Sequence, residues 1–291
     1  MKLLLLMNPS SCGGSGKKLW NRLFSALDEK GVEYQKHTLS NIEEAFELAK
    51  TASGVDIIAA VGGDGTINAV ASGVLENPDP GIKFAVLYTG TSPDFCRFHD
   101  IPTEPEKAVE LLSVGLSREI PVLRANGKPF FCSCNPGMGA EVAAGANKLR
   151  PLFGDWFGTL LSLCKALLRS RKWDFQLNGT EMLSRCNHLL FTRMPYIAGG
   201  IKIELPDLKD DEYVLWYLQD LSRFGWLKIL PKLYHGGVGG TLKIVKGTTL
   251  LECQKDCPLE FDGDPHGQLP LKIDFSPRKL KLICGKKDKS L

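Results

Sequence analysis

Residues Gly62-Gly63-Asp64-Gly65-Thr66 are the segment of this chain whose types and spacing most suggest chemistry. They follow the apolar run 55–61 and precede a helical pattern that begins at Ile67. Glycines leave backbone N–H groups accessible and a helix N-terminus favours negative charge, so the turn could bind a phosphate. The carboxylate of Asp64 would suit a nucleotide phosphate that carries Mg²⁺. A tight turn with Asp64 as a helix-capping acid is the simpler alternative.

Two more segments combine small residues with polar side chains. Residues 8–17 read Asn-Pro-Ser-Ser-Cys-Gly-Gly-Ser-Gly-Lys and could surround phosphates. They do not form a P-loop, because Ser11 stands where that motif needs glycine and Lys18 stands where it needs Ser or Thr. Residues 89–95 add hydroxyls and the carboxylate of Asp94. Taken singly, the first segment could be a flexible connection and Asp94 a helix cap.

The elements around these segments predict that they meet. Apolar runs alternate with helical patterns along the first 120 residues, at 3–7, 17–30, 34–38, 42–51, 55–61, 67–75, 84–87 and 104–114. Such an order is typical of a parallel sheet covered by helices, and ligands of such sheets bind beyond the carboxyl ends of the strands. The loops that begin at Asn8, Gly62 and Thr89 should therefore converge.

After Pro121 the pattern changes to short β-like runs with two helical interruptions. The runs are 130–134, 174–177, 188–192, 202–205, 213–218, 242–246, 248–254 and 271–275, and the helical patterns are 158–169 and 222–233. We therefore predict two domains. Residues 1–120 form an α/β nucleotide-binding domain, and residues 121–291 form a mostly antiparallel β-sandwich domain, whose last residues could pack back on the first.

Composition narrows the class of protein. With 43% apolar and 24% charged residues and a net charge of +3, the 291-residue chain is typical of a globular protein and gives no case for nucleic-acid binding. No apolar run is long enough to span a membrane, and residues 1–7 are too short for a signal peptide. We expect a cytoplasmic protein with a buried first strand. The nine cysteines lack zinc-site spacing and are expected to be reduced.

Local basic clusters leave two interpretations open. Arg169, Arg171 and Lys172 end the helical pattern 158–169, and five more lysines lie near the end of the chain, at 279, 281, 286, 287 and 289. These residues could be a solvated surface with a core-packed helix before it. They could also contact an anionic membrane surface.

Together, the loops resemble the diacylglycerol kinase catalytic family, soluble lipid kinases that include bacterial diacylglycerol and phosphatidylglycerol kinases and, more distantly, sphingosine kinases. The resemblance spans almost the whole chain. It rests on Asn8-Pro9 with 14–17, on 62–68, on Gly90-Thr91 with Asp94-Phe95, on Asn135 with 139–142, and on Asp262-Gly263-Asp264-Pro265. It implies an N-terminal parallel-sheet α/β domain, a β-sandwich domain after it, and an active site in the cleft.

The resemblance also implies the residues of that site. Asp264 would accept the proton of the attacking hydroxyl, and Asp64 would lie near the Mg²⁺-bound phosphates. A Mg²⁺ site of bacterial members, L-x-x-D-x-[LY], matches Leu208, Asp211 and Tyr213, although this segment alone would read as a solvated acidic turn. ATP and Mg²⁺ are the implied cofactors. The implied ATP-binding residues are Asn8, Gly14, Thr38, Gly62, Gly63, Asp64, Gly65, Thr66, Ile67, Asn68 and Thr91.

Two positions depart from the family's pattern. Asp264 replaces the usual Glu and is one methylene shorter, and Pro93 replaces an Asn, which removes a side-chain hydrogen bonder and a backbone donor. Misplacement of a catalytic group by about an ångström can cost on the order of a hundredfold in rate. The departures leave a weakened or specialised enzyme as an alternative.

Three hypotheses follow. The first is an ATP- and Mg²⁺-dependent kinase acting on a hydroxyl of a membrane lipid, with diacylglycerol as the default acceptor. The second is an NAD kinase-like enzyme, and the third is a nucleotide- or lipid-binding regulator with weakened catalysis. The expected partner is the lipid substrate, met by peripheral contact with the inner face of the membrane. A homodimer is compatible with the sequence, and nucleic acid is not expected.

Overall fold

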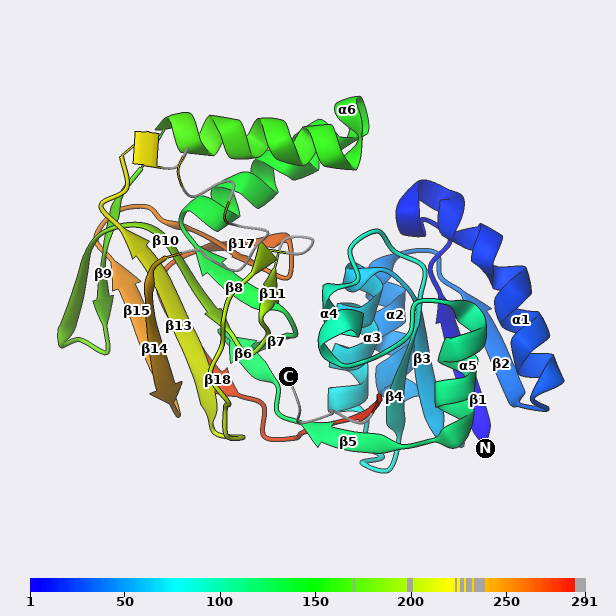
Figure 1. Ribbon diagram of the computed structural model, residues 1–291. Helices are drawn as coiled ribbons and strands as arrows, with labels where there is room; N and C mark the ends of the chain where they lie inside the picture. The colour runs from blue at the N-terminus through cyan, green and yellow to red at the C-terminus, as the bar shows by residue number, and fades with distance from the viewer. Residues whose placement is uncertain are drawn as a thin grey trace. The chain divides into compact units, whose positions relative to one another are not determined.

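The computed structural model describes residues 1–169, 171–197, 201–222, 224–225, 228, 232 and 239–285. The chain divides into two compact units, the first made of residues 1–122 with the chain from Pro277, the second of residues 123–276. Each unit contains its own large sheet (Figure 1). The units are described separately below.

The sheet of the first unit is mostly parallel. Its described strands lie in the order β2-β1-β3-β4-β19-β5, and only the β19–β5 pair is antiparallel. All six residues of β3 are buried, as expected of a strand covered on both faces. The bounds are β1 Lys2–Met7, β2 Glu33–Thr38, β3 Ile57–Gly62, β4 Lys83–Tyr88, β5 Ser117–Ile120 and β19 Leu280–Ile283.

Helices cover both faces of this sheet (Figure 1). On one face, leucines of α1 and α5 pack with the odd-numbered residues of β1. Elsewhere, α2 and α3 approach closely at Gly73, where a Cβ atom would lie 2.4 Å from the carbonyl oxygen of Phe46. The bounds are η1 Ser11–Leu19, α1 Trp20–Glu29, α2 Ile42–Thr51, α3 Asp64–Glu76, α4 Asp94–Phe98 and α5 Pro105–Val114.

Two helix starts differ from the prediction. Helix α3 begins at Asp64 rather than Ile67, because Gly63 is already the N-cap and its carbonyl accepts the N–H of Ile67 over 3.0 Å. The pattern predicted to start at Lys17 is a 3₁₀ segment, η1, followed by α1. Residues 12–14 within η1 have left-handed backbone angles, which is why the regular helix starts only at Trp20.

The second unit is built on an antiparallel sheet that curls (Figure 1). Its described strands follow the order β17-β16-β8-β10-β9-β15-β18-β6-β7, and β13 pairs with both β10 and β14. The bounds are β6 Leu123–Ala125, β7 Lys128–Phe130, β8 Ser133–Pro136, α6 Met138–Arg169, β9 Trp173–Leu177, β10 Glu181–Thr192, β11 Tyr196–Ile197, β12 Ile201–Lys202, β13 Glu212–Gln219, β14 Thr241–Lys246, β15 Thr249–Cys253, β16 Pro258–Phe261, β17 Asp264–Gln268 and β18 Leu271–Phe275. The predicted class, a parallel α/β part followed by an antiparallel β part, is confirmed. The cleft remains a prediction.

Helix α6 is longer than the predicted 158–169. It contains glycines that weaken a helical pattern, yet it starts at Met138. Its first turns contact its second half, because Ser162 Oγ donates a hydrogen bond to the carbonyl of Val142 over 2.8 Å. Gly145 makes this contact possible, since a Cβ atom there would lie 2.1 Å from Ser162 Oγ. Most of the other helical prediction, 222–233, lies outside the described residues.

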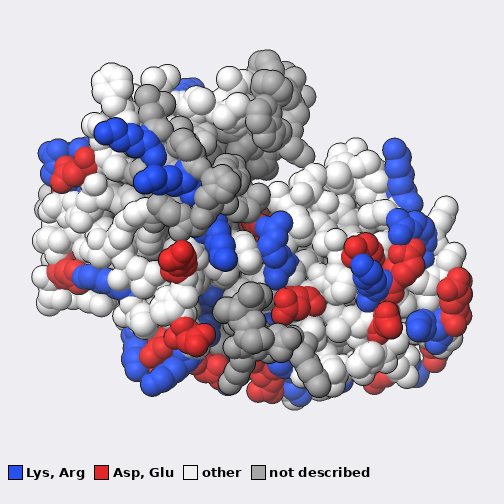
Figure 2. All heavy atoms as spheres, in the orientation of Figure 1, with Lys and Arg blue, Asp and Glu red and all other residues white. Residues whose placement is uncertain are grey.

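Other features bear on the expectations about location. In the portion of the chain that the structure describes, no helix has both the length and the apolar character needed to cross a membrane. Figure 2 shows Lys and Arg interspersed with Asp and Glu on the visible face. All nine cysteines are free thiols.

Candidate active site

Three loops of the first unit meet beyond the carboxyl ends of β1, β3 and β4, as predicted. Asn8 follows β1, and its Nδ2 donates a hydrogen bond to Oγ1 of Thr66, in the first turn of α3, over 2.9 Å. The backbone N–H of Asn8 donates to the carbonyl of Val61 over 2.9 Å. Thr66 is 1% exposed, so this hydroxyl serves the loop contact rather than solvent. The first loop is thereby attached to the glycine turn.

The loop after β4 is attached to both of the others. Ser11 Oγ donates to the carbonyl of Thr89 over 2.8 Å, and Thr89 Oγ1 donates to Ser11 Oγ over 3.1 Å. The N–H of Thr89 donates to the carbonyl of Gly62 over 2.9 Å. Gly16 also lies against this loop, because a Cβ atom there would be 2.9 Å from the Thr89 carbonyl oxygen. Five hydrogen bonds, two at Asn8 and three at Thr89, thus hold the three loops together.

Glycine is required where the second and third loops touch. A Cβ atom on Gly90 would lie 2.6 Å from the Cα of Gly63, and one on Gly62 would lie 2.3 Å from Thr66 Oγ1. Real Cβ atoms do not approach other atoms this closely. The GGDGT sequence therefore does more than cap a helix, because its glycines also permit the approach of a neighbouring loop.

Asp64 is half-buried in the first turn of α3, near two buried side chains. Burial, and next the nearby Asp64 carboxylate, raise the pKa of Tyr88 far above its usual value. The same two causes raise the pKa of the Cys96 thiol. Both groups therefore stay protonated at neutral pH. The negative charge beside Tyr88 therefore comes from the carboxylates of Asp64 and, more weakly, Asp94, and Asp94 is paired with Arg97.

The remaining nucleotide-binding candidates lie in the same part of the first unit. Thr38 ends β2 and pairs with Met7, so it is beside the start of the first loop. Gly14 has a left-handed φ of 87°, which glycine adopts without strain. Thr91 is exposed on the loop after β4. Ile67 is 1% exposed, so a ligand could reach only its backbone.

Pro93, the departure in the third loop, is the N-cap of the short helix α4. An N-cap position does not need a backbone donor within the helix, so the missing N–H of proline is tolerated there. Asp94 is 4% exposed and accepts a hydrogen bond from the guanidinium of Arg97 over 3.0 Å. Asp94 is therefore the first residue of α4 and pairs with Arg97 within the helix, and the N-cap is Pro93.

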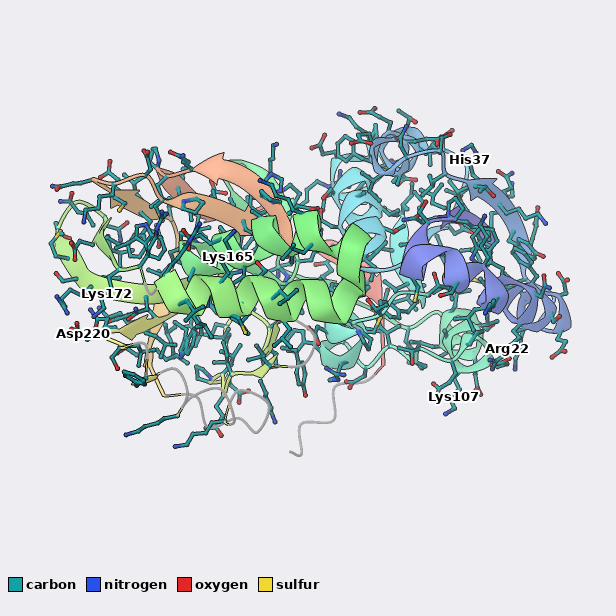
Figure 3. The ribbon with its side chains drawn as sticks, turned by 90° about the horizontal axis from the view of Figure 1, so that it is seen from above. Arg22, His37, Lys107, Lys165, Lys172 and Asp220 are labelled. Carbon is teal, nitrogen blue, oxygen red and sulfur yellow. The ribbon has the colours of Figure 1, made fainter. Side chains whose placement is uncertain are left out.

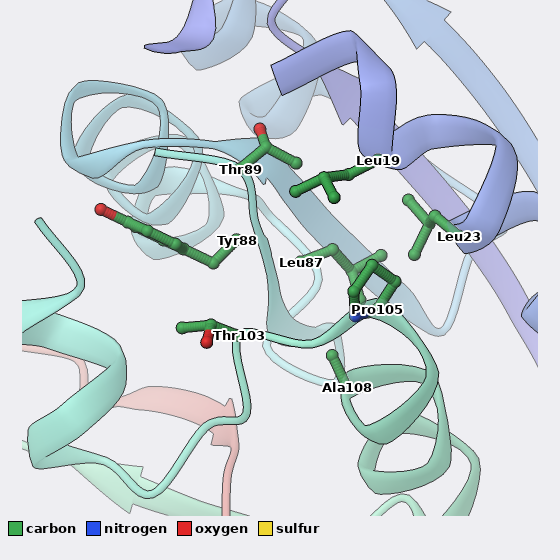
Figure 4. Close-up of a pocket in the computed structure, with 8 residues that line it drawn as sticks. All are labelled: Leu19, Leu23, Leu87, Tyr88, Thr89, Thr103, Pro105 and Ala108. Carbon is green, nitrogen blue, oxygen red and sulfur yellow. The ribbon is translucent and has the colours of Figure 1, made fainter. Parts of the chain in front are cut away.

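A small pocket next to these loops has a different character (Figure 4). Its cavity volume is about 10 Å³, far less than the roughly 300–1,000 Å³ of a site for a drug-sized ligand. Its lining is mainly apolar, and Tyr88 extends away from Leu23 and Pro105 (Figure 4). The lining residues are Leu19, Leu23, Leu87, Tyr88, Thr89, Thr103, Pro105 and Ala108. Such a lining offers no cation or array of amides for a phosphate.

In the second unit, Asp262 and Gly263 form the two-residue turn between β16 and β17. Their φ angles are 51° and 91°, and Phe261 pairs with Asp264 across the turn. Asp-Gly with two positive φ angles is the combination that a tight type I′ hairpin requires. The Asp262 carboxylate accepts the N–H groups of Phe131, Cys132 and Ser133 over 2.7, 2.7 and 3.1 Å. Asp262 therefore anchors the hairpin.

Asp264 is the first residue of β17 and is exposed. Behind it lies a second acid that the sequence analysis did not identify. Glu260 is 5% exposed, and its carboxyl accepts the N–H of Gly263 and a hydrogen bond from Asn135 Nδ2 over 2.7 Å. Burial raises the pKa of Glu260 to about 8, with smaller contributions in the same direction from Asp262 and Asp264. Leu259 and Phe261 face the core, so alternation along β16 places Glu260 on the opposite face, and the sequence pattern gave no sign that this face is buried too.

The predicted Mg²⁺ loop lies at the start of β13. Asp211 is exposed there, whereas the Tyr213 ring is fully buried and its hydroxyl contacts Thr249 Oγ1. The structure adds a basic residue that the sequence analysis missed. Arg193 Nη1 donates to the carbonyl of Lys209 over 2.9 Å and also to the carbonyl of Glu212. The role of the loop in metal binding remains a prediction.

Comparison with known proteins fits this arrangement. Residues 2–125 match the family model of the diacylglycerol kinase catalytic domain. The predicted resemblance to this family is confirmed. The matched segment contains all three loops of the first unit, so the family's pattern and the observed contacts concern the same residues.

Relatives of the chain match it over nearly its whole length. A Bacillus subtilis protein named diacylglycerol kinase is 25% identical over 97% of this chain and 96% of its own. A Staphylococcus aureus protein of the same name is 25% identical over 91% of this chain and 87% of its own. A crystal structure from Bacillus anthracis titled as a diacylglycerol kinase has a TM-score of 0.72 at 17% identity, covering 98% and 97% of the two chains. The last comparison shows a shared fold.

Proposed function

We propose that this chain is an ATP- and Mg²⁺-dependent lipid kinase. It transfers the γ-phosphoryl group of ATP to a hydroxyl of a membrane lipid, with diacylglycerol as the first candidate acceptor. The observation that carries the proposal is the joining of three strand-end loops in the first unit, within a segment that matches the diacylglycerol kinase catalytic domain. The names of the relatives support the same activity.

In this proposal the first unit binds the nucleotide. Backbone N–H groups of the glycine turn and the N-terminus of α3 receive the phosphates, because both present positive partial charge. Mg²⁺ bound with ATP would supply neutralisation of the phosphate charge. Asp64, half-buried in the first turn of α3, would be the carboxylate beside that cation. Asn8 and Ser11 hold the loops at the spacing that the nucleotide requires.

The second unit supplies the base. Asp264 accepts the proton of the lipid hydroxyl as that oxygen attacks the γ-phosphorus, and the bond from phosphorus to the β,γ-bridging oxygen breaks to release ADP. Three N–H donors hold Asp262 at the turn before Asp264, so the backbone at the base is rigid. A rigid backbone fixes where the shorter side chain of Asp264 can place its carboxylate.

The lipid is met at the inner face of the membrane, from the cytoplasm. Helix α6 presents one exposed face that combines Leu160, Leu161 and Leu168 with Lys165 and Arg169, and Figure 3 shows the position of Lys165 on it. This spacing repeats every three to four residues, and apolar residues beside basic ones are typical of helices that lie on anionic bilayers. Leu168, 68% exposed, would contribute most.

Part of the basic cluster is already engaged in ion pairs. Arg171 pairs with Glu141 over 2.8 Å, and Lys172 pairs with Asp220 over 3.2 Å. Lys172 and Asp220 are marked in Figure 3. These two basic residues therefore contribute less net charge to a membrane contact than Lys165 and Arg169 do. The tail lysines 286, 287 and 289 lie outside the described residues.

Turnover of ATP with a panel of acceptors tests the activity. Mixed vesicles of phosphatidylcholine with diacylglycerol, phosphatidylglycerol or a sphingoid base are compared with soluble NAD. We expect Mg²⁺-dependent phosphorylation of a lipid, and a loss of at least about a hundredfold in Asp264→Asn and Asp64→Asn. Lys107→Ala, an exposed position on α5, is the matched control and should retain full activity.

The other results are equally informative. Phosphorylation of NAD alone would replace the lipid kinase with an NAD kinase. Binding of ATP without turnover on any acceptor would leave a regulator that binds nucleotide.

For the membrane contact, Leu168→Glu should reduce sedimentation with anionic vesicles, whereas Met182→Glu, a 55% exposed residue on β10, should not. Equal sedimentation of both variants with the vesicles would show that α6 does not contact the membrane.

A further inference from the structure

The segment Leu208–Tyr213, whose pattern implies a Mg²⁺ site, is closed by hydrogen bonds of its own. The N–H of Glu212 donates to the carbonyl of Lys209 over 3.1 Å, and the N–H of Lys209 donates to the Glu212 carboxylate over 3.0 Å. Glu212 is 7% exposed, so both bonds have one buried end. The turn is therefore formed before any ligand is added.

Arg193 adds the positive charge to this turn. It follows β10, is half-buried, and donates through Nη1 to the carbonyls of Lys209 and Glu212. These carbonyls belong to the residues adjacent to Leu208 and Tyr213. The guanidinium also lies 5.8 Å from the centre of the Phe275 ring, which faces it from another strand. A guanidinium with two backbone acceptors and an aromatic neighbour has a fixed position.

The charges of the loop are already balanced. It carries three acids, Asp210, Asp211 and Glu212. Three bases lie among them, because Lys246 pairs with Glu212 over 3.1 Å and both Lys209 and Arg193 interact with the acids electrostatically. Protein sites for Mg²⁺ rely on uncompensated carboxylates and accessible oxygens. A divalent ion bound here would be repelled by Arg193. It would also lie next to the carbonyls of Lys209 and Glu212, which already accept hydrogen bonds from Arg193.

We propose that Arg193 is the resident cation of this loop and that it replaces the Mg²⁺ implied by the family pattern at Leu208, Asp211 and Tyr213. The residues present do not fit a bound divalent ion, because a side-chain guanidinium supplies the positive charge that such an ion would bring. The inference concerns this loop alone. It is independent of the proposed kinase activity, in which Mg²⁺ accompanies the nucleotide.

Direct metal binding tests the proposal in the nucleotide-free, full-length protein. Mn²⁺, a paramagnetic probe for Mg²⁺ sites, is titrated into wild type and Asp211→Asn and followed by electron paramagnetic resonance. We expect the two isotherms to coincide, because Asp211 holds no metal. One equivalent of Mn²⁺ bound by wild type and lost in Asp211→Asn would overturn the proposal, whatever the variants of Arg193 do.

Stability gives a second, independent measurement. Wild type should unfold at the same temperature in EDTA and in Mg²⁺. Arg193→Gln should unfold about 3–6 °C lower, since it loses two charge-assisted bonds. Mg²⁺ should restore part of this loss, and the restoration should disappear in the double variant with Asp211→Asn. Arg193→Lys should fall between the two, because its ammonium retains the charge without the fork geometry.

Arg22→Gln is the matched control, because its guanidinium pairs with Glu106 on an exposed surface of the first unit and should show no response to Mg²⁺. A wild-type protein destabilised by EDTA, or an Arg193→Gln variant as stable as wild type, would contradict the proposal. If Arg193→Gln fails to fold, the Mn²⁺ comparison of wild type with Asp211→Asn still decides the question.

Discussion

Gly63 and Gly90 approach so closely that a Cβ atom on Gly90 would lie 2.6 Å from the Cα of Gly63. The contact joins the turn before α3 to the loop after β4, and both sides of it are backbone. Because both contacting groups are backbone, a side chain at Gly90 could fit only if the loops moved apart, whereas a Cβ atom on Gly63 would lie 3.3 Å from the Cα of Gly90 and need a smaller shift. The spacing of the backbone amides proposed to bind phosphate therefore depends on the absence of a side chain at Gly63 and Gly90.

Gly90→Ala should weaken both stability and nucleotide binding. Overpacking of this kind costs about 1–3 kcal/mol, and a comparable loss in binding would lower ATP affinity about tenfold. Thermal unfolding and calorimetric titration with a non-hydrolysable ATP analogue measure the two effects. Gly239→Ala, in the second unit, has no atom within 4 Å of the added Cβ and should change neither. Unchanged affinity in Gly90→Ala would show that this loop does not take part in binding.

Asn8→Ala removes the bond between the first loop and Thr66. A single neutral hydrogen bond contributes about 1 kcal/mol, so ATP affinity should fall about fivefold while the unfolding temperature changes little. The same calorimetric titration measures the change. Ser113→Ala, which loses a bond to the Val109 carbonyl within α5, is the control of similar size. A loss confined to stability would assign Asn8 a purely structural role.

Asp262→Ala should destabilise the second unit more than Asp262→Asn does. The carboxylate accepts three backbone N–H groups, and the residue has a φ of 51°, which Asn tolerates and Ala does not. We expect a loss of about 2–4 kcal/mol for Ala and about half of that for Asn. Denaturant unfolding followed by far-UV circular dichroism gives both values. Equal losses would mean that neither the charge nor the backbone angle matters.

Glu260 makes stability depend on pH. Its pKa is about 8 in the folded protein, above the ordinary value of 4.5, so between these values the unfolded chain has released a proton that the folded chain retains. Stability should therefore fall as pH rises from about 4.5 to about 8, by at most about 1.4 kcal/mol per unit. Glu260→Gln should remove this slope. Chemical denaturation at a series of pH values measures it, and an unchanged slope would show that another group titrates.

Asp264→Glu restores the acid that the family usually has. Asp264 is exposed and follows a turn that is anchored on its own, so the longer side chain can be accommodated without moving the backbone. We expect kcat for the lipid acceptor to rise, with little change in the KM for ATP, because the base acts only in the transfer step. Steady-state kinetics with the lipid acceptor measure both kcat and the KM for ATP. A fall in kcat would mean that the surroundings are adapted to the shorter acid.

Local patterns in the sequence were sufficient for most of the first unit. Continuous apolar runs such as 55–61, which contains most of β3, identify strands buried on both faces, and the alternation with helical patterns predicts a parallel sheet whose loops meet at one edge. The convergence of the loops at Asn8, Gly62 and Thr89 followed from that order alone. Asp262-Gly263 is an equally local signal for a tight hairpin, although the sequence analysis did not use it.

Other features were decided only by the tertiary structure. Strand β19 lies between β4 and β5, where Leu282 pairs with Phe84 and Leu280 with Ile120. The return of α6 on itself depends on Gly145 and Ser162, and the burial of Glu260 and the position of Arg193 depend on strands remote in sequence. Periodicity reports which side of a segment is apolar, because that is a local property. It does not report which distant segment covers that side, and burial and charge pairing are set by that partner.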